Sequence, residues 1–145
     1  MSNPKLRCED LSVGDQREAV VVENLSRTQI VQYAGASGDF NPIHHDETFA
    51  TGAAGYPSVF AHGMLTMGLT GKLLTDWLGD GVLRSFGVRF VSQVWPGDTL
   101  TARGTVRSVE DRGDDGLVSI DLVTVNQKGE PVVTGSATAL LARSR

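Results

Sequence analysis

The sequence contains a single cysteine, Cys8, so no disulfide can form within the chain, which suits a reducing compartment. It has no apolar run near the roughly 18 residues of a membrane-spanning helix, and its first residues lack the apolar core of a secretion signal. Lys and Arg number 13 against 17 Asp and Glu, and the net charge of −4 argues against nucleic-acid binding. We therefore expect a cytoplasmic protein that binds neither nucleic acid nor membrane.

What is present fits one domain that spans residues 1–145. Hydrophobic residues make up 40% and charged residues 21% of the chain, values that are ordinary for a globular protein with a core. No internal repeat, low-complexity tract or linker divides the sequence.

The first part of the chain mixes one strand with short helical segments. The Val-rich segment 18–25 predicts a strand, and Ser26 or Thr28 can cap the helix that follows it. Asp46 can cap a further helical turn. The Gly- and Ala-rich stretch 51–63 predicts a loop that crosses the surface.

A helix over residues 64–78 comes next, and its first half is apolar nearly all round, which is typical of a buried helix. Gly68 and Gly71 weaken it by about 1 kcal/mol each and predict close approach of another backbone. The remaining chain alternates between apolar and polar residues, as strands do, over residues 82–95, 99–110, 117–127 and 132–142. An antiparallel sheet needs a cover for its apolar face, so we predict an α+β fold in which the sheet wraps around this helix.

The stretch SGDFNPIHHD, residues 37–46, gathers acids and histidines at one place. Taken alone, Asp39 is most simply a loop carboxylate that binds backbone N–H groups, and His44 is most simply structural. The Asn41-Pro42 pair, however, takes the chain out of helix and places Asp39 and His44 on the two arms of a tight excursion. A carboxylate that faces an imidazole is a plausible acid–base pair, because His titrates near neutral pH.

A metal site is the alternative for the same stretch. Potential ligands are His44, His45, Asp46 and His62. Adjacent histidines point apart in most backbones, and no His pair at i, i+4 and no Cys pair supports a site. We therefore predict no metal, and we expect His45 to be a solvated neighbour.

A second cluster, AHGMLTMG, stands at the start of the predicted buried helix. The N–H of Gly63 would be one of the unpaired donors of the first turn, where the helix dipole favours negative charge, as on a thioester oxyanion. The simpler interpretation is a tight-turn glycine before a helix. His62 is either structural or a ligand contact, and Tyr33 on the preceding helix is expected to serve in packing.

These residues resemble the MaoC-type (R)-specific hydratase/dehydratase family. The family signature stands here as YAGASGDFNPIHHDETFA, residues 33–50, and its His-Gly-Met-Leu stands at residues 62–65. Within the family, AHGMLTMG and TDWLGD are similar to the catalytic subunit of the mycobacterial-type 3-hydroxyacyl-ACP dehydratase, which pairs with a related subunit that lacks the dyad.

The resemblance implies a single hot-dog fold and dimerisation through the sheets, with a second copy or a related hot-dog subunit. It assigns Asp39 and His44 as the catalytic dyad and the Gly63 N–H as the oxyanion donor. It implies reversible hydration of a trans-2-enoyl thioester of CoA or acyl carrier protein to the (R)-3-hydroxyacyl thioester, with no cofactor. The residues that we expect at the substrate are Asn41, which would also orient the dyad, His62 and Met64.

The chain departs from the family in one respect, and other activities remain open. Several CoA-specific members support the catalytic Asp with a Ser on the central helix, whereas this region reads Leu69-Thr70-Gly71, so Thr70 or backbone donors would hold Asp39. A non-catalytic acyl-binding subunit is one alternative, although both dyad residues are present. A hot-dog thioesterase is another. Candidates for a basic rim that meets the carrier are Arg84, Arg89, Arg103 and Arg107.

Overall fold

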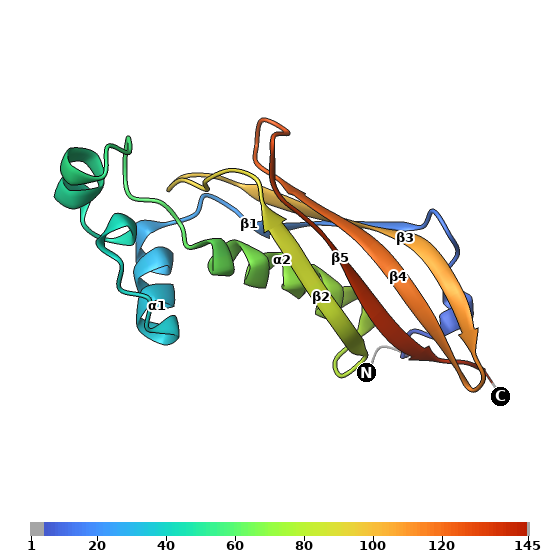
Figure 1. The fold of residues 1–145 in the computed structure, drawn as a ribbon. Helices are drawn as coiled ribbons and strands as arrows, with labels where there is room; N and C mark the ends of the chain where they lie inside the picture. Colours follow the sequence, from blue (N-terminus) through green and yellow to red (C-terminus); the bar gives the residue numbers. More distant parts are fainter. Residues whose placement is uncertain (1–4, 145) are drawn as a thin grey trace.

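The computed structural model describes residues 5–144 and consists of one antiparallel sheet with one long helix against it (Figure 1). The five strands run in the order β1-β3-β4-β5-β2. Their bounds are β1 Gln16–Val22, β2 Leu83–Phe90, β3 Leu100–Arg112, β4 Asp115–Val125 and β5 Pro131–Ala142. Consecutive hairpins join β3, β4 and β5, while β1 and β2 form the two edges.

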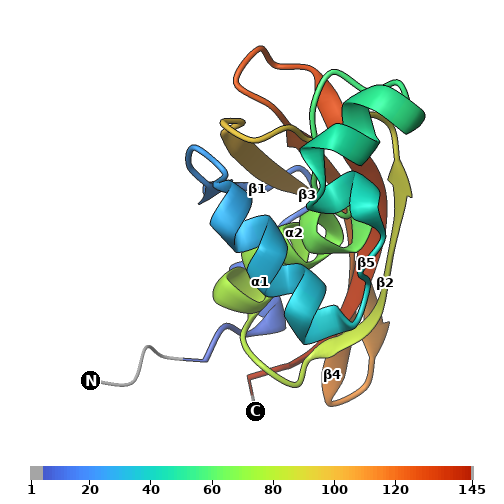
Figure 2. The same ribbon diagram turned by 90° about the vertical axis from the view of Figure 1, so that its left-hand side faces the viewer.

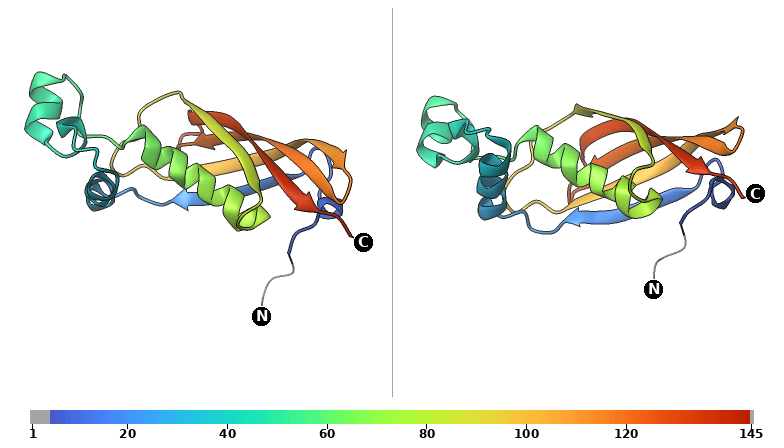
Figure 3. Two further views of the ribbon diagram at one scale, coloured as in Figure 1. Left: turned by 60° about the horizontal axis from the view of Figure 1, so that its bottom comes forward. Right: turned by 90° about the horizontal axis from the view of Figure 1, so that it is seen from below.

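Helix α2, Gly63–Leu78, lies along the concave side of this sheet (Figures 2 and 3). Leu73, Leu74 and Leu78 of the helix are at most 3% exposed and pack on the inward residues of the central strands. The predicted alternation places the correct side chains inside, which are Leu100, Ala102, Val106, Val118, Ile120, Leu122, Ala137, Ala139 and Leu141. The predicted α+β hot-dog architecture is therefore confirmed.

The prediction that the first half of α2 is buried all round is wrong for the single chain. Met64 is 54% exposed and Gly68 is exposed, because the sheet forms one layer and covers only one side of the helix. The prediction that Gly71 admits another backbone is also wrong. A Cβ at Gly71 would lie 3.1 Å from the ring of Phe86 on β2, so it is a side chain that approaches the helix there.

Helix α1, Arg27–Ser37, and the helical turns Pro42–His44 and Phe49–Ala53 form a lobe at one end of the sheet (Figure 1). A 3₁₀ turn, Cys8–Asp10, lies at the other end, against β4. Ser26 caps α1 by accepting a hydrogen bond from Gln29 N at 3.0 Å, as one of the two predicted caps. Asp46 accepts from Phe49 N at 3.1 Å, which confirms the predicted cap. The stretch predicted as a loop begins with a π-helical turn, Phe49–Ala53, so its first residues are helical.

Among residues 5–144, no helix has both the length and the apolar character to cross a membrane.

Candidate active site

The chain reverses direction directly after α1, and this turn positions Asp39. Gly38 ends the helix in the left-handed conformation, with φ of 75°, and its N–H donates to Ala34 O. Glycine adopts this conformation without steric cost. Asp39 then starts the loop, and its Oδ1 accepts a hydrogen bond from Asn41 N at 3.2 Å. A backbone donor, one of the two predicted alternatives, thus holds the carboxylate.

A short 3₁₀ turn, Pro42–His44, brings His44 back towards Asp39. Asn41 caps this turn, because its Oδ1 accepts from Ile43 N at 3.2 Å, and Pro42 suits the first position of a helical turn. His44 closes the turn and is only 7% exposed. The tight excursion predicted from Asn41-Pro42 is therefore present.

The imidazole of His44 is held in one tautomer. Its Nδ1 lies 2.7 Å from the carbonyl oxygen of Phe60, and a carbonyl only accepts, so Nδ1 carries the proton. Nε2 is then left as a free base. Burial lowers the pKa of His44 below its usual range, and nearby His62 and His45 lower it further, while the Phe60 carbonyl and the Asp39 carboxylate act in the opposite direction. His44 is therefore neutral near pH 7.

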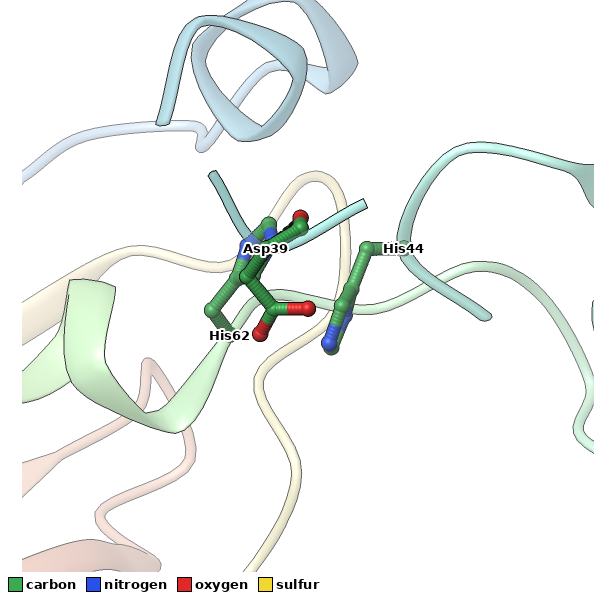
Figure 4. Close-up of side chains that lie close together, drawn as sticks. All are labelled: Asp39, His44 and His62. Carbon is green, nitrogen blue, oxygen red and sulfur yellow. Dashed lines mark hydrogen bonds between the residues drawn. The ribbon is translucent and has the colours of Figure 1, made fainter. Parts of the chain in front are cut away.

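Asp39, His44 and His62 meet at one point of the structure. Each offers a polar atom that lies within 4.8 Å of the others. Figure 4 shows the carboxylate of Asp39 turned towards the ring of His44, with His62 beside them. The carboxylate of Asp39 and the imidazole of His44, which the sequence predicts to face one another, are therefore close together in the structure. This pair can take and return a proton on a molecule held between them.

Gly63 lies at the N-terminus of α2, close to the pair. Its N–H donates no hydrogen bond to another of the described residues, and it points out of a helix end whose dipole favours negative charge. A Cβ at this position would lie 3.1 Å from the ring of Phe90, so Phe90 lies directly over the glycine. The structure thus leaves a backbone donor free at this helix end, and its role towards an oxyanion remains a prediction.

A cavity of about 310 Å³ opens beside Gly63, between the start of α2, the end of β2 and the start of β5. Most of its wall is apolar, and Thr66, Ser92 and Gln93 add polar groups. The wall consists of Phe60, Ala61, Gly63, Thr66, Phe90, Val91, Ser92, Gln93, Val94, Val132 and Val133. Such a cavity suits an apolar chain whose polar end reaches Gly63.

The structure places the three predicted substrate contacts elsewhere. Asn41 caps the 3₁₀ turn, Met64 is 54% exposed, and His62 is 2% exposed. None of the three forms part of the cavity wall, and neither do Asp39 and His44. Their contact with substrate remains a prediction. His45 points away from His44 and has Nε2 3.0 Å from Phe40 O, and Tyr33 packs edge-on against His62.

Two other sequence expectations are changed by the contacts. Thr70 does not hold Asp39, because its hydroxyl donates to Thr66 O and lies 2.7 Å from the hydroxyl of Thr124. Two arginines of the expected basic rim are paired on the sheet, Arg103 with Glu18 and Arg107 with Asp121. Each of these two arginines is thus matched by a carboxylate on a neighbouring strand.

The three ligand-type side chains suit an acid–base site better than a metal site. The rings of His44 and His62 are stacked, with centroids 3.8 Å apart and planes 26° from parallel. The nitrogen lone pairs of two stacked rings point in parallel directions. A tetrahedral zinc ion instead needs the lone pairs of its ligands to point at one position, about 2.0–2.1 Å from each nitrogen. In addition, Nδ1 of His44 and Nε2 of His62 face carbonyl oxygens.

Sequence reasoning missed the carbonyl of Phe60 and the ring of Phe90. Every residue has a carbonyl, so no residue type could have indicated the partner of His44 Nδ1. The alternation over residues 82–95 puts Phe90 on the same strand face as Phe86 and Val88, but its position over Gly63 depends on the register between β2 and β5, in which Phe90 pairs with Val133. Neither position was available without the fold.

Comparison with known proteins finds relatives over most of the chain. The family model described as "MaoC like domain" matches residues 10–127. The beta subunit of 3-oxo-4,17-pregnadiene-20-carboxyl-CoA hydratase from Mycobacterium tuberculosis is 35% identical over 106 residues, which cover 72% of this chain and 78% of that subunit.

A second relative from the same organism, 3-hydroxyacyl-thioester dehydratase Y, is 46% identical over 68 residues, or 45% of this chain. The match spans 23% of that relative, so most of the relative's length has no counterpart in the matched segment. Among solved structures, R-hydratase PhaJ1 from Pseudomonas aeruginosa superimposes with a TM-score of 0.82 at 26% identity, covering 97% of this chain and 88% of the other.

Proposed function

The chain belongs to the MaoC-like domain family, and from that premise we propose that it hydrates trans-2-enoyl thioesters reversibly to (R)-3-hydroxyacyl thioesters. The observation that carries the proposal is that Asp39 and His44 meet His62, the residue directly before Gly63 at the start of α2. The Asp39 carboxylate faces His44, whose Nε2 is free, and the unpaired N–H of Gly63 stands at the cavity wall. The names of the relatives, which are hydratases and dehydratases of acyl thioesters, support the same reaction.

The reaction follows from these positions. The Gly63 N–H binds the thioester oxygen and polarises the carbonyl, so that C3 of the enoyl group becomes electrophilic and charge moves towards an enolate. A water held between Asp39 and His44 attacks C3, and its oxygen forms the new C–O bond. The dyad takes one proton from this water and gives one proton to C2, so the protein ends in its starting protonation state.

Dehydration uses the same groups in reverse. The dyad removes the proton from C2 of the 3-hydroxyacyl thioester while Gly63 stabilises the enolate oxygen, and the C3 hydroxyl leaves as water after it is protonated. Both protons are handled from the side on which Asp39 and His44 lie, so hydroxyl and hydrogen occupy the same face of the substrate. This geometry fixes one configuration at C3, which we propose is R.

Other activities fit the contacts less well. A thioesterase needs a nucleophile or a base that directs water at the thioester carbonyl. In the proposed binding mode the carbonyl oxygen lies at Gly63, and the dyad would act on the neighbouring carbons instead. A non-catalytic acyl-binding subunit would not need His44 with a free Nε2 opposite a carboxylate. The hydratase is therefore the function that uses every group in the site.

The substrate is proposed to be a CoA or acyl-carrier-protein thioester, and the partner a second hot-dog chain. Edge strand β2 carries Phe90, which is 50% exposed, and adjacent Val91 is 51% exposed. An exposed apolar edge is expected to be covered in solution. A second copy of this chain or a related subunit can provide that cover, and one relative is itself named a beta subunit.

The test is hydration of crotonyl-CoA and longer enoyl-CoA thioesters, and the reaction is monitored by the decrease in enoyl-thioester absorbance. Asp39→Asn and His44→Gln are expected to lower kcat by more than about 10²-fold, since each removes one acid–base group. Asp46→Asn and His45→Gln are matched controls on exposed neighbouring residues and should stay within a factor of about 3.

Comparable turnover by the dyad variants and the controls would show that Asp39 and His44 do not carry the chemistry. If the wild-type chain is inactive alone but becomes active with a related subunit, the reaction stands and the chain works as one half of a heterodimer. Release of free CoA at the rate of enoyl loss would instead support the thioesterase.

A further inference from the structure

His62 occupies an unusual position between the three groups of the proposed active site. It is the residue before Gly63 and the N-cap of α2, yet its side chain makes no capping bond to that helix. The ring is 2% exposed and turns away from the helix, towards the loop that carries Asp39 and His44. A side chain that caps its own helix would point the other way.

Three contacts hold the ring in that place. Its Nε2 lies 3.1 Å from the backbone carbonyl of Asp39, so it is Nε2 that carries the proton and donates. One face of the ring stacks on His44, with centroids 3.8 Å apart. Tyr33 of α1 packs edge-on at 4.9 Å. His62 thus contacts Asp39 through a hydrogen bond, His44 through its ring, and Gly63 through the peptide bond.

Packing alone does not account for an imidazole here. With the proton on Nε2, Nδ1 is an acceptor, and it is buried without a hydrogen-bond partner among residues 5–144. Burying an unpaired polar nitrogen costs free energy that an apolar ring of similar size would avoid. The donor to Asp39 is the feature that distinguishes the imidazole from such a ring.

We propose that His62 is a positioning residue that sets the placement of Asp39, His44 and Gly63 relative to one another. The inference rests on the proposed hydratase function and assigns His62 a role other than direct contact with substrate. The Nε2–H donor fixes the backbone at Asp39, and hence the direction of its carboxylate. The ring fixes the plane of His44 and shields one face of it from water.

Two variants separate the donor from the ring. His62→Gln keeps a donor at the same number of bonds from Cα as Nε2, but removes the stacked ring. His62→Phe keeps a ring against His44 and Tyr33, but removes the donor. His45→Gln is the control, because it removes a neighbouring exposed imidazole that does not stack on His44.

The two variants are expected to fail differently. In His62→Phe the Asp39 carbonyl loses its donor, so kcat should fall about 10- to 100-fold while KM changes by less than about threefold, as misplacement of a reacting group predicts. In His62→Gln, water reaches His44, so the midpoint of its titration should move up towards the usual value of 6.5, and the acid limb of kcat/KM should move with it.

The groups that also act on His44 must be held constant in this comparison. They are the Asp39 carboxylate, the Phe60 carbonyl and His45, none of which the variants replace. Both variants remove the charge of His62, which itself lowers the pKa of His44, so the loss of the ring is measured by the difference between the two variants. The titration of His44 is followed by nitrogen NMR of the imidazoles without substrate. This readout does not depend on turnover, so it tests the positioning role even if the hydratase assay of the wild type fails.

Unchanged kcat and an unchanged His44 titration in both variants would overturn the proposal. So would losses of activity that match only the loss of folded protein, as measured by circular dichroism at the assay temperature, because a purely structural His62 predicts that result. A donor-specific loss of kcat in His62→Phe, together with a larger upward His44 shift in His62→Gln than in His62→Phe, would establish it.

Discussion

Gly63 allows one backbone N–H to be removed without disturbing the helix that carries it. Proline is well tolerated at the first position of a helix, and the preceding residue, His62, already has the extended backbone, φ −59° and ψ 137°, that proline requires before it. Gly63→Pro should therefore fold with α2 intact but lack the oxyanion donor. We expect kcat to fall about 10²- to 10³-fold, as measured on enoyl-CoA.

Gly63→Ala is the matched control for this loss. Both substitutions add a Cβ that must displace the ring of Phe90, which lies 3.1 Å away and is 50% exposed. Alanine keeps the N–H, so its kcat should fall by less than about tenfold. If alanine and proline lower kcat equally, contact with Phe90 rather than the lost donor is responsible.

His44 predicts a dependence on pH with a definite sign. Its folded-state pKa lies below the usual value of 6.5, so between the two values the unfolded chain binds a proton that the folded chain does not. The stability that the fold gains from a neutral His44 is therefore fully present above pH 6.5. It is lost as the pH falls through the folded-state pKa. The acid limb of kcat/KM should likewise lie below 6.5.

The neighbouring carboxylate provides a test of that pKa. Asp39 acts to raise the pKa of His44, so Asp39→Asn should move the His44 titration further down. Nitrogen NMR of the imidazole measures this shift without requiring activity, and Asp46→Asn serves as control. A midpoint that stays in place or rises would contradict the assigned electrostatics of the pair.

The residues of the site could be predicted from the sequence only in part. Asp39 and His44 could be paired because Asn41-Pro42 restricts the backbone between them, and that restriction is local. The partner of His44 Nδ1, the Phe60 carbonyl, comes from 16 residues away, and His62 reaches the Asp39 carbonyl across 23 residues. Such contacts depend on how the lobe closes, which no local pattern encodes.

Among the elements, α2 is attached to the sheet by a polar contact within an otherwise apolar core. Thr70 and Thr124 of β4 are both fully buried, and their hydroxyls lie 2.7 Å apart. Thr70 donates to Thr66 O, so the Thr124 hydroxyl is the donor between the two. Thr70→Val leaves that donor unpaired and should lower the free energy of unfolding by about 1–3 kcal/mol, as measured with urea.

The reverse substitution should cost less. Thr124→Val leaves Thr70 bonded to Thr66 O, so the expected loss is about 0.5–1.5 kcal/mol. A larger loss for Thr124→Val than for Thr70→Val would show that the donor between the two hydroxyls is Thr70 and not Thr124. Folded Thr70→Val should keep kcat within a factor of about 3 of wild type, because its hydroxyl does not reach Asp39.

The strands follow the sequence more closely than the helical segments do. From Leu100 to Val106, every second side chain points to the one face of the sheet that is covered. The alternation in the sequence therefore matches the alternation in burial. In α2 the apolar pattern suggests burial all round, whereas the single chain covers one side. The turn capped by Asp46 was predicted, but its extension through residues 51–53 was not, because Thr, Gly and Ala also occur in loops.

At the scale of the whole molecule, the exposed apolar edge predicts association. Met64, Phe90 and Val91 are each at least half exposed and lie near the cavity end of α2 and β2. We expect the purified chain to sediment at about twice its mass of 15.5 kDa. A monomer at micromolar concentration would contradict self-association and direct the search to a related hot-dog subunit.

The two ends of the described chain lie together, because Arg7 donates to the carbonyl of Arg143 at 3.0 Å. Figure 1 shows the end of β5 on the side of the sheet away from α1 and its lobe. A chain tethered to a sensor surface through either end would thus present its cavity outwards. The rate at which the tethered chain binds an acyl thioester should therefore match the rate in free solution, even when no long spacer separates the chain from the surface.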